Sequence, residues 1–206
     1  MSESKEKSTI TKKGEINYAN PIMIGQLKAN KNFFENEKKR FLEMYKTSID
    51  AGKINEQQVD QIIHNTIVEK NILEGVKQYL RQYFTANIDD GEKQFVIEQI
   101  KAQVKDMPED KLEHAAKNII FEKLLFNYLG NNEWGIKVTD GEVNDTLEQH
   151  YKATNQSIRE FKENPARFEE IRAQVFTQKV IREIMKRFKV RAEVDLTTGT
   201  DQEQKN

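Results

Sequence analysis

The sequence contains no cysteine, which excludes disulfide bridges, thiolate nucleophiles and zinc–thiolate sites and suits a reducing compartment. Proline and glycine are scarce, at 3 and 9 of 206 residues, so little in the chain interrupts helices. Hydrophobic residues make up 36% of the chain and charged residues 33%. This balance is more typical of helices with long charged flanks than of a thick sheet core.

An excess of charge of either sign is also missing, because 33 basic and 34 acidic residues give a net charge of −1. A chain without a strong field attracts neither nucleic acid nor an anionic bilayer. No run approaches the roughly 20 apolar residues of a membrane span, and residues 1–20 lack the apolar core of a secretory signal. We therefore expect a cytoplasmic protein that binds neither nucleic acid nor membranes.

Recognisable catalytic motifs are absent as well. His64, His114 and His150 lie far apart, and neither HExxH nor a phosphate-binding glycine pattern occurs. Carboxylates such as Asp89 and Glu169 are better explained as helix caps and solvated helix faces than as acid–base pairs. We expect a protein that is not an enzyme and that needs no cofactor and no metal.

What the sequence does contain is apolar periodicity between capping residues, which predicts an all-α fold. The predicted helices run from about residue 21 or 26 to 50, from 55 to about 85, from 89 to about 104, from 106 to 130 and, after a loop at 130–138, through the rest of the chain. Residues 1–20 and 197–206 are polar and are predicted to be flexible tails. Residues 21–196 form the helical domain, and a division into two lobes, about 21–130 and 131–196, stays open.

The capping signals are clearest between residues 138 and 196. Thr139 with Glu142 predicts a capping box, and Ser157 with Glu160 opens a second short helix. Asn164 caps a long third helix with Pro165 at its first position. That helix ends in a short β-like run that starts at Val190.

This layout resembles the end of trigger factor, the bacterial chaperone, and is similar to the helical domains of SurA-type chaperones. The matching positions cover about a quarter to a third of the chain: Val138, Thr139, Asp140, Glu142, Val143, Leu147, Tyr151, Glu163, Asn164, Pro165, Lys189 and Val190. The resemblance implies an elongated multi-helix body with protruding helical arms that binds unfolded polypeptide. Nothing in the sequence corresponds to the ribosome-docking and prolyl isomerase domains of trigger factor, so those activities are not implied.

Helical phase adds two expectations, at about 100° per residue. In the helix over 108–129, one apolar face carries Leu112, Ala115, Ala116, Ile119 and Phe126, and the opposite face carries Phe121, Leu124, Leu125 and Tyr128. Either the helix is packed on both sides, or the second face lines a cleft open to client chains, together with Tyr79, Tyr83 and Phe84. In the last long helix the apolar stripe changes sides near Thr177, which predicts two different packing partners, either within one bundle or in a body with protruding arms.

Two functions follow. The first is an ATP-independent chaperone, a holdase, that binds unfolded or nascent polypeptides through an apolar cleft between helices. The alternative is a helical scaffold or assembly factor that grips one dedicated protein partner. The sequence indicates neither the clients nor the oligomeric state.

Overall fold

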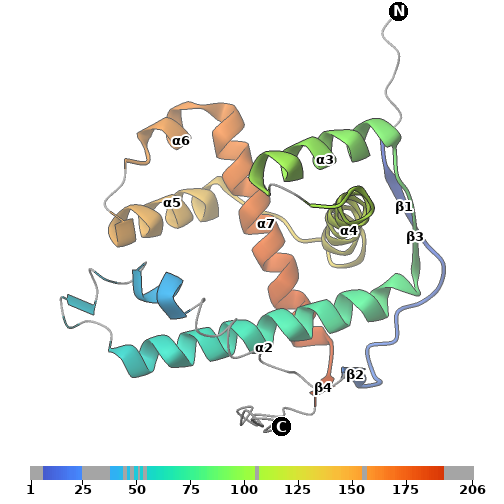
Figure 1. Cartoon of the computed structure of the whole chain (residues 1–206), viewed down its shortest axis with the longest axis horizontal. Coiled ribbons are helices and arrows are strands. Elements are labelled where there is room, and N and C mark those ends of the chain that lie inside the picture. Colours follow the sequence, from blue (N-terminus) through green and yellow to red (C-terminus); the bar gives the residue numbers. More distant parts are fainter. Residues whose placement is uncertain are drawn as a thin grey trace, which may run out of the picture. The chain divides into compact units, whose positions relative to one another are not determined.

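The structure is a computed structural model that describes residues 7–24, 38–43, 46, 49–50, 52, 55–104, 107–154 and 157–192. Helices dominate this part of the chain, which confirms the all-α class (Figure 1). The named helices are α2 (Glu56–Arg81), α3 (Asp90–Gln103), α4 (Glu109–Tyr128), α5 (Asp140–Thr154), α6 (Arg159–Glu163) and α7 (Pro165–Arg187). The strands are β1 (Thr9–Lys12), β2 (Ile22–Ile24), β3 (Phe84–Asn87) and β4 (Val190–Ala192).

The chain divides into two compact units, and both are discontinuous in sequence. Unit 1 consists of Met1–Ile16 and Leu80–Arg187, and unit 2 consists of Asn17–Tyr79 and Phe188–Asn206. A boundary between lobes near residue 130 is not observed. The reason is that Gly130 packs directly against Phe176 and Val180 of α7, so a cut there would pass through a core.

In unit 1, α3 and α4 pack against each other around Ile97, Leu112 and Ala116. Asp89 caps α3 as predicted, with its side chain accepting from the Glu92 N–H at 2.8 Å. The helix α4 continues into a π-helical turn, Leu129–Glu133, so only the second half of the loop predicted at 130–138 is a loop. A Cβ at Gly130 would lie 2.3 Å from the Phe176 ring, which explains why glycine occupies this position.

α5 and α7 begin where the capping signals place them, whereas α6 begins at Arg159 with Ile158 at its N-cap and without a side-chain cap. Thr139 and Glu142 exchange hydrogen bonds, with the Thr139 N–H donating to Glu142 at 2.9 Å and the Glu142 N–H donating to the Thr139 hydroxyl at 3.3 Å. The Asn164 side chain accepts from the Ala166 N–H at 3.0 Å, and Pro165 opens α7. Contacts of α7 with α5, α6 and the π-helical turn agree with the prediction of different packing partners along this helix.

A two-stranded antiparallel sheet corrects two predictions for unit 1. β1 pairs with β3 in the register Thr9↔Asn87 to Lys12↔Phe84, so part of the predicted tail at 1–20 is a strand. The helix predicted to reach residue 85 ends at Arg81, because Phe84 already belongs to β3. Sequence periodicity missed this sheet because each strand has only four residues and its partner lies far away in sequence.

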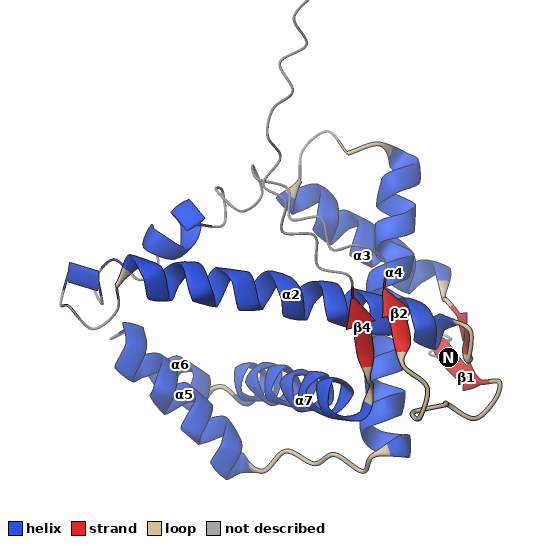
Figure 2. Ribbon diagram, turned by 90° about the horizontal axis from the view of Figure 1, so that it is seen from below, coloured by secondary structure: helices blue, strands red, loops and turns tan. Residues whose placement is uncertain are grey.

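Unit 2 contains α2 as far as Tyr79 and a parallel pair formed by β2 and β4, which Figure 2 shows side by side. A capping box starts α2, because the Asn55 N–H donates to Gln58 and the Gln58 N–H donates to Asn55, each at 2.9 Å. For the helix predicted from residue 21 or 26 to 50, a start at Pro21 is wrong because β2 lies there, a start at Gln26 falls outside the described residues, and Lys38–Glu43 is helical. Residues 25–37 and parts of 44–54 lie outside the described residues.

Candidate functional site

The predicted client cleft is closed by packing. Phe121, Leu125 and Phe84 are buried, and Leu124, Tyr128, Tyr79 and Tyr83 are half-buried. The Phe84 and Tyr128 rings meet edge to face with centroids 5.3 Å apart, and the Arg81 guanidinium lies 4.3 Å from the Phe121 ring centroid. An open cleft on this face of α4 is therefore wrong for Phe121, Leu125 and Phe84.

The physical reason is the sheet that the sequence did not indicate. Both β1 and β3 contact α4, so this face of α4 is a second packed side rather than a groove. The alternative interpretation, a helix packed on both sides, describes α4 correctly. Of the predicted residues, Tyr79 belongs to unit 2 and the others belong to unit 1.

Large apolar side chains are exposed elsewhere in unit 1. Phe95 on α3 is 58% exposed, Ile119 on α4 is 49% exposed and Tyr151 on α5 is 47% exposed. Val104, directly after α3, is also exposed. We refer to Phe95, Val104, Ile119 and Tyr151 as the exposed apolar residues of unit 1.

A signal for Phe95 was present in the sequence. Phe95 and Ile97 are two residues apart, which is about 200° around a helix, so the two side chains point to nearly opposite faces. Ile97 is buried against α4. Phe95 must then face away from that contact. Ile119 gave no such signal, because it shares the face of Leu112 and Ala116 and is exposed all the same.

Unit 2 has a different feature, an aromatic cluster made of Tyr18, Tyr79 and Phe188. The Phe188 ring centroid lies 5.0 Å from that of Tyr18 and 6.2 Å from that of Tyr79. The Tyr79 hydroxyl donates to the Asn17 carbonyl oxygen at 3.1 Å. Three stretches of chain that are far apart in sequence are thereby brought together. The sequence assigned Phe188 to the last helix, whereas α7 ends at Arg187 and the Phe188 side chain is only 5% exposed.

Charged side chains of α7 bind the linker between the π-helical turn and α5. Arg172 donates to the Val138 carbonyl oxygen at 2.9 Å and pairs with Asp140, and Lys179 donates to the Lys137 carbonyl oxygen at 2.7 Å. Lys179 also pairs with Glu142, and this hydrogen bond, followed by that from the Thr139 N–H, lowers the pKa of Glu142. These groups are engaged with one another, so their role in the fold is structural.

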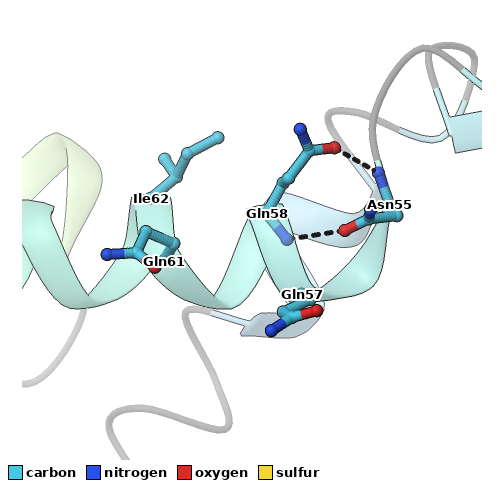
Figure 3. A pocket seen from close by; sticks show the side chains of 5 residues that line it. All are labelled: Asn55, Gln57, Gln58, Gln61 and Ile62. Atoms are coloured by element: carbon cyan, nitrogen blue, oxygen red, sulfur yellow. Dashed lines mark hydrogen bonds between the residues drawn. The ribbon is translucent and has the colours of Figure 1, made fainter.

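A hollow of about 400 Å³ lies at the start of α2 (Figure 3). The described residues that line it are Asn55, Gln57, Gln58, Gln61 and Ile62. Asn55 and Gln58 hold each other in the capping box, as the dashed lines in Figure 3 show. The carboxamides of Gln57 and Gln61 remain as groups that both donate and accept, which suits a neutral polar ligand better than proton transfer.

Within the described ranges there is no group of three or more His, Asp or Glu side chains that could hold a metal ion. Among the same residues, no helix combines the length and the apolar character that crossing a membrane requires.

Comparison with known proteins finds similarity to uncharacterized Mycoplasma proteins. No family model matches the chain. It is 28% identical over 184 residues to an uncharacterized MG377 homolog of Mycoplasma pneumoniae, covering 89% of this chain and 92% of that protein. It is 27% identical over 175 residues to the uncharacterized protein MG377 of Mycoplasma genitalium, covering 84% of this chain and 87% of that protein.

A solved structure shares the fold. The crystal structure of the hypothetical Mycoplasma protein MPN555 superposes with a TM-score of 0.77 at 26% sequence identity, over 93% of both chains. The similarity extends over almost the whole length of each chain, so it includes both units.

Proposed function

We propose that the protein is an ATP-independent holdase that binds unfolded or nascent polypeptides in the cytoplasm. The observation that carries the proposal is the exposure of Phe95 on α3, at 58%, with Ile119 exposed on α4 and Tyr151 exposed on α5 of the same unit. Exposed apolar side chains on one unit offer contact area to an unfolded chain that is long enough to reach several of them. Burial of apolar surface has no directional requirement, so such residues accept many client sequences.

The expected binding is weak for any one contact. Fully burying a large apolar side chain is worth roughly 1.5–3 kcal/mol, so a half-exposed one contributes about 1 kcal/mol when a client covers it. Association costs at least about 4 kcal/mol. A short peptide that covers one position should therefore bind poorly, whereas a long unfolded chain that reaches several positions gains from multivalency. This behaviour lets clients leave and fold.

The order of caps and helices between Val138 and Val190 supports the same proposal by its resemblance to the end of trigger factor and to SurA-type chaperones. The sequence positions that carry the resemblance begin α5 and α7 through Thr139, Glu142 and Asn164. A holdase of this kind uses no nucleotide and no metal.

Suppression of aggregation tests the proposal. Several unrelated proteins are denatured and diluted into buffer with the wild-type chain, and light scattering is followed without nucleotide. The wild type should reduce scattering at near-stoichiometric ratio, and Phe95→Ser with Ile119→Ser should lose at least half of that protection. Gln99→Ser is the matched control, because Gln99 is exposed one helical turn after Phe95 on the same face of α3. Its protection should equal that of the wild type.

The competing function is a scaffold or assembly factor. If the chain protects none of the denatured proteins but co-purifies stably with one native protein, the holdase proposal is wrong and the scaffold is favoured. Equal protection by the wild type and the double variant would show that the exposed apolar residues of unit 1 do not bind clients.

A further inference from the structure

The last described residues of the chain complete unit 2. We refer to residues 188–192 as the C-terminal strap. The strap is attached by the parallel pairing of β4 with β2, by a hydrogen bond of 2.8 Å from the Ile22 N–H to the Lys189 carbonyl oxygen, and by the ring of Phe188. Burial alternates along it, because Phe188 is buried, Val190 is half-buried, and Lys189 and Arg191 are exposed.

The two strands of this pair are not equally secured. Ile24 of β2 rests directly on α2, since a Cβ at Gly75 would lie 1.9 Å from a methyl carbon of Ile24, and Ile22 is buried. The strand β2 is therefore built into unit 2 by its own side chains. The strand β4 has only three residues, and parallel pairing is the less stable kind, so the strap is held by a few backbone hydrogen bonds together with the Phe188 ring.

We propose that the edge of β2 and the aromatic cluster beside it are a second polypeptide-binding site, which the C-terminal strap occupies as an internal competitor. The inference rests on the proposed holdase function and adds a binding mode to it. When the strap leaves, the edge of β2 offers backbone N–H and C=O groups, and the rings of Tyr18 and Tyr79 lose their cover by Phe188. An extended client segment can then add to β2 as a parallel strand, as in β-strand addition.

The strap itself indicates which segments fit. Side chains two residues apart point to the same face of a strand, so Phe188 and Val190 share a face. Phe188 contacts the aromatic cluster, and Val190 is the register partner of Ile22 on β2. The site should prefer an extended segment with an aromatic residue followed two positions later by a branched aliphatic residue. Main-chain hydrogen bonds supply the remaining affinity and place no demand on the other side chains.

The strap competes with added peptides for the site and so determines their apparent affinity. A tethered segment competes at an effective concentration on the order of millimolar, so a free peptide binds weakly to the wild type. Removing the competition should raise the apparent affinity, and fixing the strap should abolish binding. Both changes are available without touching the aromatic cluster, because the side chains of Met23 and Arg191 are exposed register partners on the same face of the pair.

The strap can be locked by a disulfide. Neighbouring strands lie about 4.8 Å apart, which is within the Cα separations that disulfides bridge. The double variant Met23→Cys/Arg191→Cys should therefore form one bond under oxidising conditions, and the native chain has no other cysteine to interfere. The opposite variant is Arg191→Pro, which removes the backbone N–H at the centre of β4 and weakens the pairing.

The binding experiment uses the full-length chain and a fluorescent peptide with the sequence of residues 186–192, followed by fluorescence anisotropy. We expect Arg191→Pro to bind the peptide about tenfold more tightly than the wild type, or better. The oxidised Met23→Cys/Arg191→Cys variant should not bind the peptide, and reduction of its disulfide should restore binding. The control peptide carries Phe188→Ser and should bind to none of the proteins. Equal peptide binding by the wild type, Arg191→Pro and the oxidised lock would overturn the inference.

Aggregation assays separate this inference from the proposed function. If the wild type protects clients and oxidation of the lock lowers its protection, both stand. If the wild type protects clients and the oxidised and reduced lock protect equally, the site under the strap is not used for clients, while the holdase remains. If the wild type protects no client, the holdase fails, and the peptide experiment alone decides whether the strap covers a binding site.

Discussion

The two small sheets of the molecule are built in opposite ways. β1 and β3 are antiparallel strands of four residues that both contact α4, and Lys12 at the end of β1 pairs with Glu133 at 2.7 Å. β2 and β4 are parallel strands of three residues, and the Phe188 ring is the deeply buried side chain that holds β4. The β1–β3 sheet therefore has several independent attachments within unit 1, whereas β4 is held in unit 2 by a three-residue pairing and one buried ring.

The largest expected effect is the loss of that ring. Phe188→Ala should cost about 3–5 kcal/mol of stability, as for other buried phenylalanines. Amide hydrogen exchange should show faster exchange in α2 and β2 of unit 2, with α3 and α4 of unit 1 retaining their protection. Phe95→Ala, at an exposed position, is the control and should change exchange in neither unit. Equal loss of protection in both units would contradict the contrast between them.

A smaller effect is expected at the contact between β2 and α2. Gly75→Ala adds a methyl group where Ile24 lies, so overpacking should cost about 1–3 kcal/mol in urea unfolding. Gly14→Ala in unit 1 is the control, because nothing lies within 4 Å of the added Cβ there. If both variants were equally stable, β2 would not be fixed to α2 in the way described.

Removal of a helix cap in unit 1 should have the next largest effect on stability. Thr139→Ala removes half of the capping box of α5 and should cost about 1 kcal/mol. Ser157→Ala should cost less, because the Ser157 hydroxyl accepts a single hydrogen bond of 3.4 Å before a five-residue helix. Thermal unfolding of the two variants compares them directly. A larger loss for Ser157→Ala would mean that the capping box is not the stronger start signal.

The smallest effect concerns pH. The Ser8 hydroxyl and then the Lys123 ammonium bond to Glu92, and together they lower the pKa of this carboxyl below its usual 4.5. A lowered pKa in the folded state means that the contribution is present above pH 4.5 and is lost as the pH falls through the folded value. Glu92→Gln should therefore be less stable than the wild type at pH 7, with the difference shrinking on acidification.

Urea midpoints between pH 7 and pH 3 measure this difference. Ser8→Ala should reproduce part of it, since the hydroxyl is the first cause of the lowered pKa. A difference between wild type and Glu92→Gln that grows towards pH 3 would have the wrong sign.

Local signals made most of the helices predictable. Asn55 with Gln58, Asp89, Thr139 with Glu142, and Asn164 each cap a helix within a few residues, and such short-range chemistry is readable from the sequence alone. The strands were harder to predict from the sequence. β4 was indicated by the short β-like run that starts at Val190, but β1, β2 and β3 depend on partners far away in sequence, which periodicity does not report.

The exposed residues proposed to bind clients were harder to predict than the strands. Helical phase gave α4 two apolar faces, but it gave no information about which face a strand would cover, and it placed the exposed Ile119 on the face of the buried Leu112 and Ala116. Phe121 and Leu125 were therefore assigned to an open cleft, although β1 and β3 pack on α4 and both side chains are buried. Exposure depends on all neighbours of a side chain, and one helix supplies only some of them.

A photo-crosslinking experiment examines the holdase proposal at a single residue. A benzoylphenylalanine replaces Phe95, and the full-length chain is irradiated with a denatured protein and, separately, with the same protein in its native state. We expect crosslinks to the denatured protein and none to the native one, and no crosslinks when the probe replaces Asn127, which is exposed on α4. Equal crosslinking at positions 95 and 127, or crosslinking to the native protein alone, would contradict the binding of unfolded chains by the exposed apolar residues of unit 1.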